Sequence, residues 1–269
     1  MNEMLFTFPQ IDPVAIALGP LQIRWYALAY VAGLIGGWWV LRRQIAAGLS
    51  VLDKDQLDGL MNACLVGILV GGRLGYVLFY NPSAYLAAPL DIVKVWQGGM
   101  SFHGGLSGVI LAILWSARRY QLSPLSIGDE VALVAPLGLL FGRLANFING
   151  ELYGRVTDHP FGIVYPGGGP LPRHPSQLYE AGLEGIVLFG LLSLAIWKGR
   201  LLMKPGYITG LFLVGYGVCR ALLENVREPD YGMPDFPLGL TMGMMLSIPM
   251  ILVGLWLIWR ARSRPPVVA

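Results

Sequence analysis

Long apolar stretches alternate with short polar or glycine- and proline-rich stretches along this chain. A helix that spans a bilayer needs about 20 largely apolar residues, and seven stretches approach this length. We therefore predict seven transmembrane helices. Their expected limits are Trp25–Leu41, Gly59–Phe79, Gly98–Ala117, Val131–Ile148, Ser176–Trp197, Gly206–Leu223 and Leu238–Trp259.

The basic residues predict how these helices are oriented. Cytoplasmic loops of membrane proteins are enriched in Lys and Arg. With the N-terminus outside and the C-terminus in the cytoplasm, every inner segment carries a basic group. These groups are Arg42, Arg43 and Lys54; Arg118 and Arg119; Lys198, Arg200 and Lys204; and Arg260, Arg262 and Arg264. The apolar run from Val14 to Leu21 is too short to span, and we expect it to lie along the interface.

Composition supports this interpretation. Of the 269 residues, 55% are hydrophobic and 13% are charged, whereas a soluble domain has about 25% charged residues. The sequence therefore predicts one all-α polytopic membrane domain over residues 1–269, and not a soluble, disordered or collagen-like protein. The net charge of +3 follows the expected topology, so no nucleic-acid partner is predicted. Two cysteines, Cys64 and Cys219, lie in apolar stretches and form neither a disulfide framework nor a metal site.

The longest connection between predicted helices runs over residues 149–175. It is rich in Gly and Pro, as in the run from Pro166 to Pro172, which favours turns. We expect it to form a small extracytoplasmic head with a short strand near Phe161–Tyr165.

Several polar side chains fall within the predicted spans at one depth, near the outer surface. Ionisable groups are costly there and are functional candidates by default. Arg143 and Asn146 share one helix face, and Tyr216, Arg220 and Glu224 recur every fourth residue on another. The remaining candidates at this depth are Tyr26, Arg73 and His103, with Glu151 just beyond the fourth span. A purely structural role, with Arg220 and Glu224 paired and Arg143 reaching the surface, is the competing interpretation.

Two arginines at this depth suggest an anionic ligand. Guanidinium groups match phosphate in geometry and charge, and the phosphates at this depth belong to phospholipid headgroups. His103 is the only histidine within a predicted span, and imidazole suits proton transfer near neutral pH. We expect neighbouring arginines to hold it neutral.

Three motifs carry a resemblance to a known family. They are His103–Gly108 (HGGLSG), Gly142–Arg155 (GRLANFINGELYGR) and His174–Glu180 (HPSQLYE), supported by Arg24–Tyr26 and by the Tyr216, Arg220, Glu224 face. In these segments, and over essentially its whole length, the chain resembles the prolipoprotein diacylglyceryl transferases.

This resemblance implies a bacterial inner-membrane enzyme with its active site toward the outer leaflet. Such an enzyme moves the diacylglyceryl group of phosphatidylglycerol onto the lipobox cysteine of a preprolipoprotein signal peptide and releases glycerol 1-phosphate, without metal or cofactor. It implies that the phospholipid and the signal peptide are the partners, and it leaves the oligomeric state open. The implied catalytic residues are His103, Arg220 and Glu224, and the implied substrate-binding residues are Tyr26, Arg143, Asn146, Glu151, Gly154 and Tyr216.

Chemistry gives these residues expected roles. A thiol has a pKa of about 8.5, so a base or a positive field assists its attack. We expect His103 to take the thiol proton, or Arg220 to favour the thiolate by its charge, while Arg143 and Arg220 stabilise the departing glycerol phosphate. Glu224 would orient Arg220. Tyr26 and Asn146 would bind the headgroup, and Glu151 would anchor the helix end.

Three alternatives stay open on sequence alone. Gly105–Gly108 matches the Gly-x-Ser-Gly pattern of intramembrane serine proteases, which would need a histidine close to Ser107. A lipid or solute carrier would use the arginines as an anionic path. Metal-assisted phosphatidyl transfer would need an aspartate cluster, and no predicted span contains one.

Overall fold

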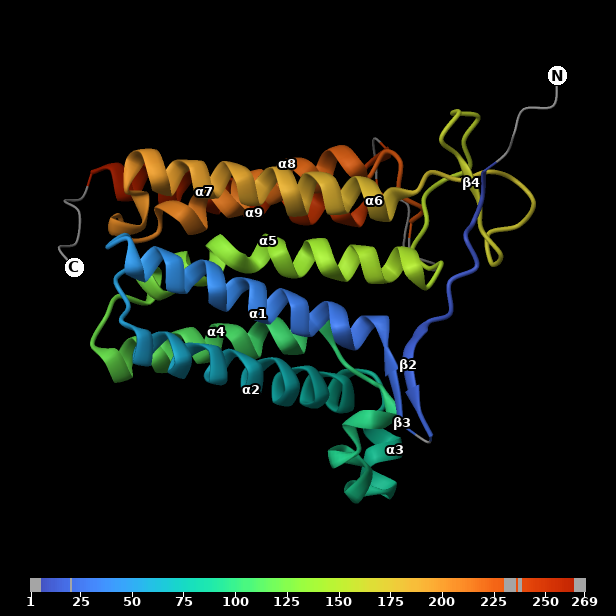
Figure 1. Cartoon of the computed structure of the whole chain (residues 1–269), viewed down its shortest axis with the longest axis horizontal. Coiled ribbons are helices and arrows are strands. Elements are labelled where there is room, and N and C mark those ends of the chain that lie inside the picture. The colour runs from blue at the N-terminus through green and yellow to red at the C-terminus, as the bar shows by residue number, and fades with distance from the viewer. Residues whose placement is uncertain (1–5, 20, 230–235, 237–238, 264–269) are drawn as a thin grey trace.

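The computed structural model describes residues 6–19, 21–229, 236 and 239–263. The chain forms an elongated bundle whose long helices run roughly along one axis (Figure 1). The long helical segments are α1 (Trp25–Ala46), α2 (Lys54–Phe79), α4 (Phe102–Tyr120), α5 (Pro124–Ile148), a continuous helix made of α6 (Ser176–Glu180), η3 (Ala181–Val187) and α7 (Leu188–Gly199), then α8 (Tyr207–Leu223) and α9 (Met242–Arg262). Short helices are α3 (Pro82–Ala87), η1 (Pro89–Val93), η2 (Val95–Gln97) and η4 (Leu201–Met203).

Successive long helices run in alternating directions. The start of α1, the ends of α2, α5 and α8, and the starts of α4 and α6 all lie at one end of the bundle, on the right in Figure 1. We call this the site end and the other the opposite end. The polar positions expected at one depth are therefore at the site end.

A helix occupies each predicted range, but five begin at a different residue, and of these α8 is shifted by only one residue, to Tyr207. The third helix begins at Phe102 rather than at Gly98, because Gly98 and Gly99 have φ of 84° and 81° and form a turn. Helix α2 begins at Lys54 and α5 at Pro124, both earlier than predicted, because polar first turns precede the apolar stretches. Leu238, the expected start of the seventh helix, lies outside the described residues, as does Arg264, and α9 begins at Met242.

Side-chain caps explain these starts. The Asp53 carboxylate accepts a hydrogen bond from Gln56 N (2.8 Å), and the Gln56 side chain accepts one from Asp53 N (3.1 Å), which forms a capping box at α2. Ser101 caps α4, and Ser123, followed by Pro124, caps α5. Such caps depend on one or two polar residues, so the positions of apolar residues alone do not predict them.

The apolar core lies toward the opposite end of the bundle. One cluster joins α1, α2, α5, α7 and α8 through buried leucines and isoleucines: Leu41, Leu57, Leu133, Leu188, Leu192, Ile196 and Ile208. Buried acids secure the same end, because Asp129 accepts hydrogen bonds from Gly206 N, Thr209 N and Thr209 Oγ1 (2.7 Å each) and Glu130 accepts one from Ser50 Oγ (2.6 Å). Buried polar groups, among them Asn146, Gln177 and Glu180, lie at the site end.

Two small sheets lie at the site end. The antiparallel strands β2 (Val14–Leu18) and β3 (Leu21–Arg24) form a hairpin where a run along the interface was expected. Strand β4 (Ile163–Val164) lies within the predicted Phe161–Tyr165 strand and pairs in parallel with β1 (Phe6–Thr7). Residues 149–175 otherwise form turns and isolated bridges.

The helices have the composition of a membrane protein. Four of those in the described residues are long and apolar enough to cross a bilayer: Lys54–Phe79, Pro124–Ile148, Ser176–Gly199 and Met242–Arg262, with Tyr207–Leu223 apolar but shorter. The architecture is that of a polytopic helical membrane protein.

Candidate active site

A chain of alternating charges joins three helices at the site end. Glu180, at the end of α6, is fully buried, and its two oxygens lie 2.6 Å from Arg143 Nε and 2.6 Å from Arg227 Nη1. Arg143 projects from the last part of α5, and Arg227 follows α8. One carboxylate therefore fixes two guanidinium groups from different parts of the chain.

The chain continues to α8. Arg220 and Glu224 form an ion pair one helical turn apart, and Glu224 Oε1 also lies 3.8 Å from Arg227 Nε. The predicted pairing of Glu224 with Arg220 is therefore present in the structure. Arg220 Nη1 is buried without a hydrogen-bond partner among the described residues, so it retains a donor for an anion.

Glu184 lies one turn after Glu180 within the π-helical segment η3. It is fully buried, and neither carboxylate oxygen has a hydrogen-bond partner in the described part of the chain. It interacts electrostatically with Arg143 and Arg220 and with Tyr216 on α8. A π-helical turn inside an α-helix is rare and frequently marks a functional site, and here it occurs where carboxylates face the arginines.

A second polar cluster connects the beginning of α1 with the end of α5. Asn146 Nδ2 donates hydrogen bonds to Tyr26 Oη and to Glu151 Oε1, the latter at 2.9 Å. Gln177 Nε2 in turn donates to the Glu151 carbonyl oxygen (2.7 Å). Glu151 therefore anchors the end of α5, and Tyr26 and Asn146 lie together as their predicted common role requires.

Gly154 lies where two backbones meet. Its N donates to His174 O (2.8 Å), and it pairs with Arg227 in an antiparallel bridge. A Cβ at this position would lie 2.8 Å from the His174 Cβ and would overlap the Val226 carbonyl. The requirement for glycine is therefore steric, and Gly154 acts on the site by placing Arg227.

Histidines of the 149–175 segment are close to each other. The rings of His159 and His174 lie 6.4 Å apart. Burial, and to a smaller extent the His159 ring, lowers the pKa of His174 below its ordinary value. The His174 carbonyl oxygen accepts the hydrogen bond from Gly154 N, so this histidine lies beside the bridge that supports Gly154.

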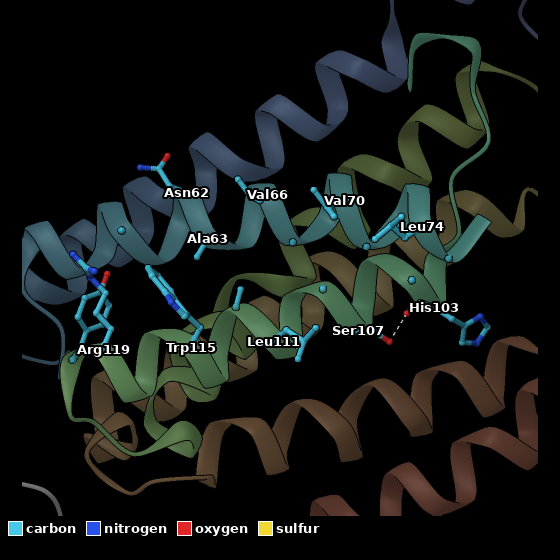
Figure 2. A pocket seen from close by; sticks show the side chains of 18 of the residues that line it. Asn62, Ala63, Val66, Val70, Leu74, His103, Ser107, Leu111, Trp115 and Arg119 are labelled. Atoms are coloured by element: carbon cyan, nitrogen blue, oxygen red, sulfur yellow. Dashed lines mark hydrogen bonds between the residues drawn. The ribbon is translucent and has the colours of Figure 1, made fainter. Parts of the chain in front are cut away.

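His103 is the candidate that the structure separates from the arginines. Its ring is exposed, packs edge-on against Phe102 with 5.6 Å between centroids, and forms no hydrogen bond or ion pair with a described arginine. Figure 2 shows it projecting from the first turn of α4. The expectation that neighbouring arginines hold His103 neutral stays a prediction.

Ser107 does not have the surroundings of a protease nucleophile. Its hydroxyl donates to the His103 carbonyl oxygen of its own helix (2.8 Å; Figure 2). The other two histidines lie in the 149–175 segment, where each ring contacts the other. The short serine motif is a feature of helix packing.

Arg73 serves a different purpose from Arg143 and Arg220. Its guanidinium donates to the carbonyl oxygens of Asp91 (2.7 Å), Ile92 (2.8 Å) and Gly99 (3.2 Å). It therefore fixes the connection between α2 and α4. It lies on α2 and is not part of the arginine cluster.

Sequence reasoning missed three charged residues of this site, Glu180, Glu184 and Arg227. The signal was available, because Glu180 and Glu184 are the acidic residues of the fifth predicted span and lie four residues apart. The two arginines expected to attract an anionic ligand are not an uncompensated positive charge. Three arginines (143, 220 and 227) face three glutamates (180, 184 and 224), so the formal charges balance.

Fold and site together define a polytopic membrane protein with a buried network of arginines and glutamates at one end of its helices. Within the described residues, no group of three or more His, Cys, Asp or Glu side chains is placed to hold a metal ion. Such a network suits binding of an anionic group at the membrane surface.

Comparison with known proteins identifies the family. The family model of prolipoprotein diacylglyceryl transferase matches residues 13–260. Proteins named phosphatidylglycerol–prolipoprotein diacylglyceryl transferase are 55% identical in Rhodospirillum rubrum (98% of each chain) and 52% identical in Caulobacter vibrioides (96% of each). The one from Methylocella silvestris is 51% identical over 98% of this chain and 99% of its own. The chain belongs to the prolipoprotein diacylglyceryl transferase family and is a transferase.

Proposed function

We propose that this chain transfers the diacylglyceryl group of phosphatidylglycerol to the lipobox cysteine of preprolipoproteins, the first step of lipoprotein maturation. The full-length similarity to proteins named phosphatidylglycerol–prolipoprotein diacylglyceryl transferase supports the proposal. The observation that carries it is the pair of arginines, Arg143 and Arg220, brought from α5 and α8 to one buried network. This pair fits the phosphate of an anionic phospholipid.

Arg143 and Arg220 bind the phosphodiester and stabilise the charge that grows on the leaving group. Arg143 forms an ion pair with Glu180, and Arg220 forms one with Glu224. These carboxylates orient the two guanidinium groups before the substrate binds. The three arginines and three glutamates of the network have balanced formal charges, so a bound phosphate adds a negative charge to it. Arg143 and Arg220 would then replace part of their contacts with carboxylate oxygens by contacts with phosphate oxygens. Tyr216, Tyr26 and Asn146 are the neighbouring polar groups for the headgroup glycerol.

The thiol sulfur attacks the glyceryl carbon that carries the phosphate oxygen. A carbon–sulfur bond forms, the carbon–oxygen bond breaks with its electron pair, and glycerol 1-phosphate departs. The thiol proton passes to a base, and we assign this role to His103, whose exposed ring on α4 is accessible to a substrate. Sulfur would therefore enter from the α4 side and the phosphate would leave toward the arginines.

We further propose seven membrane spans with the site end, including the 149–175 head, on the outer side of the bacterial inner membrane. Four arginines of the opposite end pack over tryptophans one turn earlier: Arg42 on Trp38, Arg43 on Trp39, Arg119 on Trp115 and Arg260 on Trp256. Tryptophan is enriched at membrane interfaces and arginine in cytoplasmic loops. These four Arg–Trp pairs support the proposal that the opposite end faces the cytoplasm.

The decisive experiment uses purified protein, phosphatidylglycerol and a lipobox peptide, and measures glycerol phosphate release and peptide lipidation. Wild-type protein is expected to produce both in equal amounts. A peptide with serine in place of the lipobox cysteine should give neither product. Arg143→Ala and Arg220→Ala should each lower kcat/KM by about a hundredfold or more.

Failure of the wild-type protein to release glycerol phosphate, with phosphatidylglycerol binding intact, would refute the transferase proposal and favour a lipid carrier. Lipidation without dependence on Arg143 or Arg220 would keep the activity but refute the assigned phosphate site.

A further inference from the structure

A groove of about 1200 Å³ runs along the pair α2 and α4, on the surface of the bundle. Its walls are apolar and lie on the outer surface of the bundle, not covered by other parts of the protein: Val66, Val70 and Leu74 on α2, and Leu111 and Trp115 on α4. Figure 2 shows these side chains along the two helices, with His103 near one end of the row and Arg119 near the other. The groove therefore connects the site end with the opposite end.

Glycines make the floor of this groove. A Cβ on Gly75 would lie 2.8 Å from the Gly104 Cα, and a Cβ on Gly108 would overlap the Gly67 carbonyl. The two backbones are thus in direct contact, as in small-residue packing of membrane helices. Larger side chains line only the margins, so the close approach leaves a channel instead of a ridge.

The length of the groove suits a helix of about 24 residues, which is within the 15–30 residues of a complete secretory signal peptide. Asp55 and Phe79 both line it, and α2 spans about 36 Å between them at 1.5 Å per residue. The hydrocarbon core of a bilayer is about 30 Å thick. A single phospholipid reaches through only one leaflet and would leave half of such a groove to another occupant.

The two ends differ chemically. At the opposite end the α2 wall is acidic, with exposed Asp53 and Asp55, while Arg119 on the α4 wall packs over Trp115. At the site end the groove is lined by His103. A secretory signal peptide has a basic segment, then an apolar segment and a small-residue segment near its cleavage site, which is the same order of properties.

We infer that the α2–α4 groove binds the apolar helix of the prolipoprotein signal peptide, with its basic N-terminal segment at Asp53 and Asp55 and its cysteine at His103. This inference rests on the proposed function and adds the docking surface for the peptide substrate. It also explains why His103 lies on α4, apart from the arginines: peptide and phospholipid approach from different sides.

A crosslinking experiment tests the position of the peptide. A photoreactive amino acid replaces Leu111 in the groove, or Leu252, an exposed residue of α9, as the matched control. Both proteins are placed in phosphatidylglycerol vesicles with a tagged lipobox signal peptide. We expect a peptide adduct at position 111 that unlabelled peptide competes away, and none at 252.

A charge experiment tests the orientation. Asn retains N-cap ability, so the double variant Asp53→Asn, Asp55→Asn should keep α2 intact. It should raise KM about threefold to tenfold for a peptide with a lysine-rich start, the range expected for two exposed ion pairs. The KM for phosphatidylglycerol, and that for a peptide with a neutral start, should not change. Asp58→Asn, which removes a carboxylate bound to Arg42 and Trp38 outside the groove lining, should have no effect.

Each outcome separates the groove from the activity. Normal lipidation with only lipid adducts at position 111, or with equal peptide adducts at 111 and 252, would overturn the groove as the peptide site and leave the proposed function standing. Absence of lipidation by the wild-type protein would refute the function itself. An equal KM change for both peptides in the aspartate variant would overturn the assigned orientation.

Discussion

At the scale of single residues, Glu180 is the centre of the site, because it contacts Arg143 and Arg227 at once and is fully buried. A buried carboxylate between two guanidinium groups is costly to remove, since Arg143 then loses its carboxylate partner and Arg227 keeps the more distant Glu224. Its role is one of positioning, because Arg143 and not Glu180 would meet the phosphate.

Glu180→Gln should therefore raise KM for phosphatidylglycerol and lower kcat/KM about tenfold to a hundredfold, and destabilise the protein by about 3 kcal/mol. Kinetics and thermal unfolding in detergent measure the two effects. The matched control is Glu228→Gln, whose carboxylate is about half exposed in its pair with Arg173 (3.1 Å) and should change stability by at most about 1 kcal/mol. An unchanged KM in Glu180→Gln would show that Arg143 does not depend on this carboxylate.

His103→Gln tests the base. General base catalysis contributes about a hundredfold to ten-thousandfold, so kcat should fall by that order. The kcat of the wild-type protein should rise with pH as the base loses its proton. In His103→Gln this increase of kcat with pH should be absent. A pH–rate profile over pH 5–9 measures both. Near-normal turnover with an unaltered profile would assign His103 a binding role.

His174 predicts a pH dependence of stability. Burial lowers its pKa in the folded state, so the unfolded chain binds the proton more tightly, and stability falls as pH decreases through the ordinary histidine pKa of about 6.5. The hydrogen-exchange protection factors of residues 149–175, which are corrected for the intrinsic pH dependence of exchange, should be lower at pH 5.5 than at pH 7.5. His174→Gln should reduce this difference. An equal difference in wild type and variant would exclude His174 as its source.

At the scale of elements, the pair α2 and α4 depends on backbone contact at glycines. Gly108→Ala would push a methyl group against the Gly67 carbonyl, so the helices must separate. We expect a destabilisation of about 1–3 kcal/mol, measured by thermal unfolding in detergent. Gly190→Ala on α7 is the control, because a Cβ there meets nothing within 4 Å, and it should not destabilise. Equal destabilisation of both variants would show that the contact with the Gly67 carbonyl is not the cause of the loss.

At the scale of the whole molecule, the alternating helices place all the candidate site residues at one end and the Arg–Trp pairs at the other. This arrangement makes the proposed orientation testable. Asp158→Cys lies in the 149–175 segment and Lys198→Cys in the last turn of α7. A membrane-impermeant thiol reagent should label intact spheroplasts at position 158, and at position 198 only after permeabilisation. The reverse pattern would invert the topology.

The sequence by itself determined the helical class, the ranges of the helices, and which motifs resemble a transferase family. Apolar stretches of membrane length are a local property, since lipid requires each spanning segment to satisfy its own backbone hydrogen bonds. The starts of α2, α4 and α5 were less predictable. Each depends on a single N-cap residue, Asp53, Ser101 or Ser123, which lies outside the apolar stretch.

Only the tertiary structure decided which charges share a site. Glu180 joins Arg143 and Arg227 across sequence separations of 37 and 47 residues, and Arg73, at the same predicted depth, turns instead to the carbonyls of residues 91–99. Depth along a helix follows from counting residues. The direction in which a side chain points, and the partner it meets, follow from how helices pack, and a pattern along one helix carries no information about its neighbours.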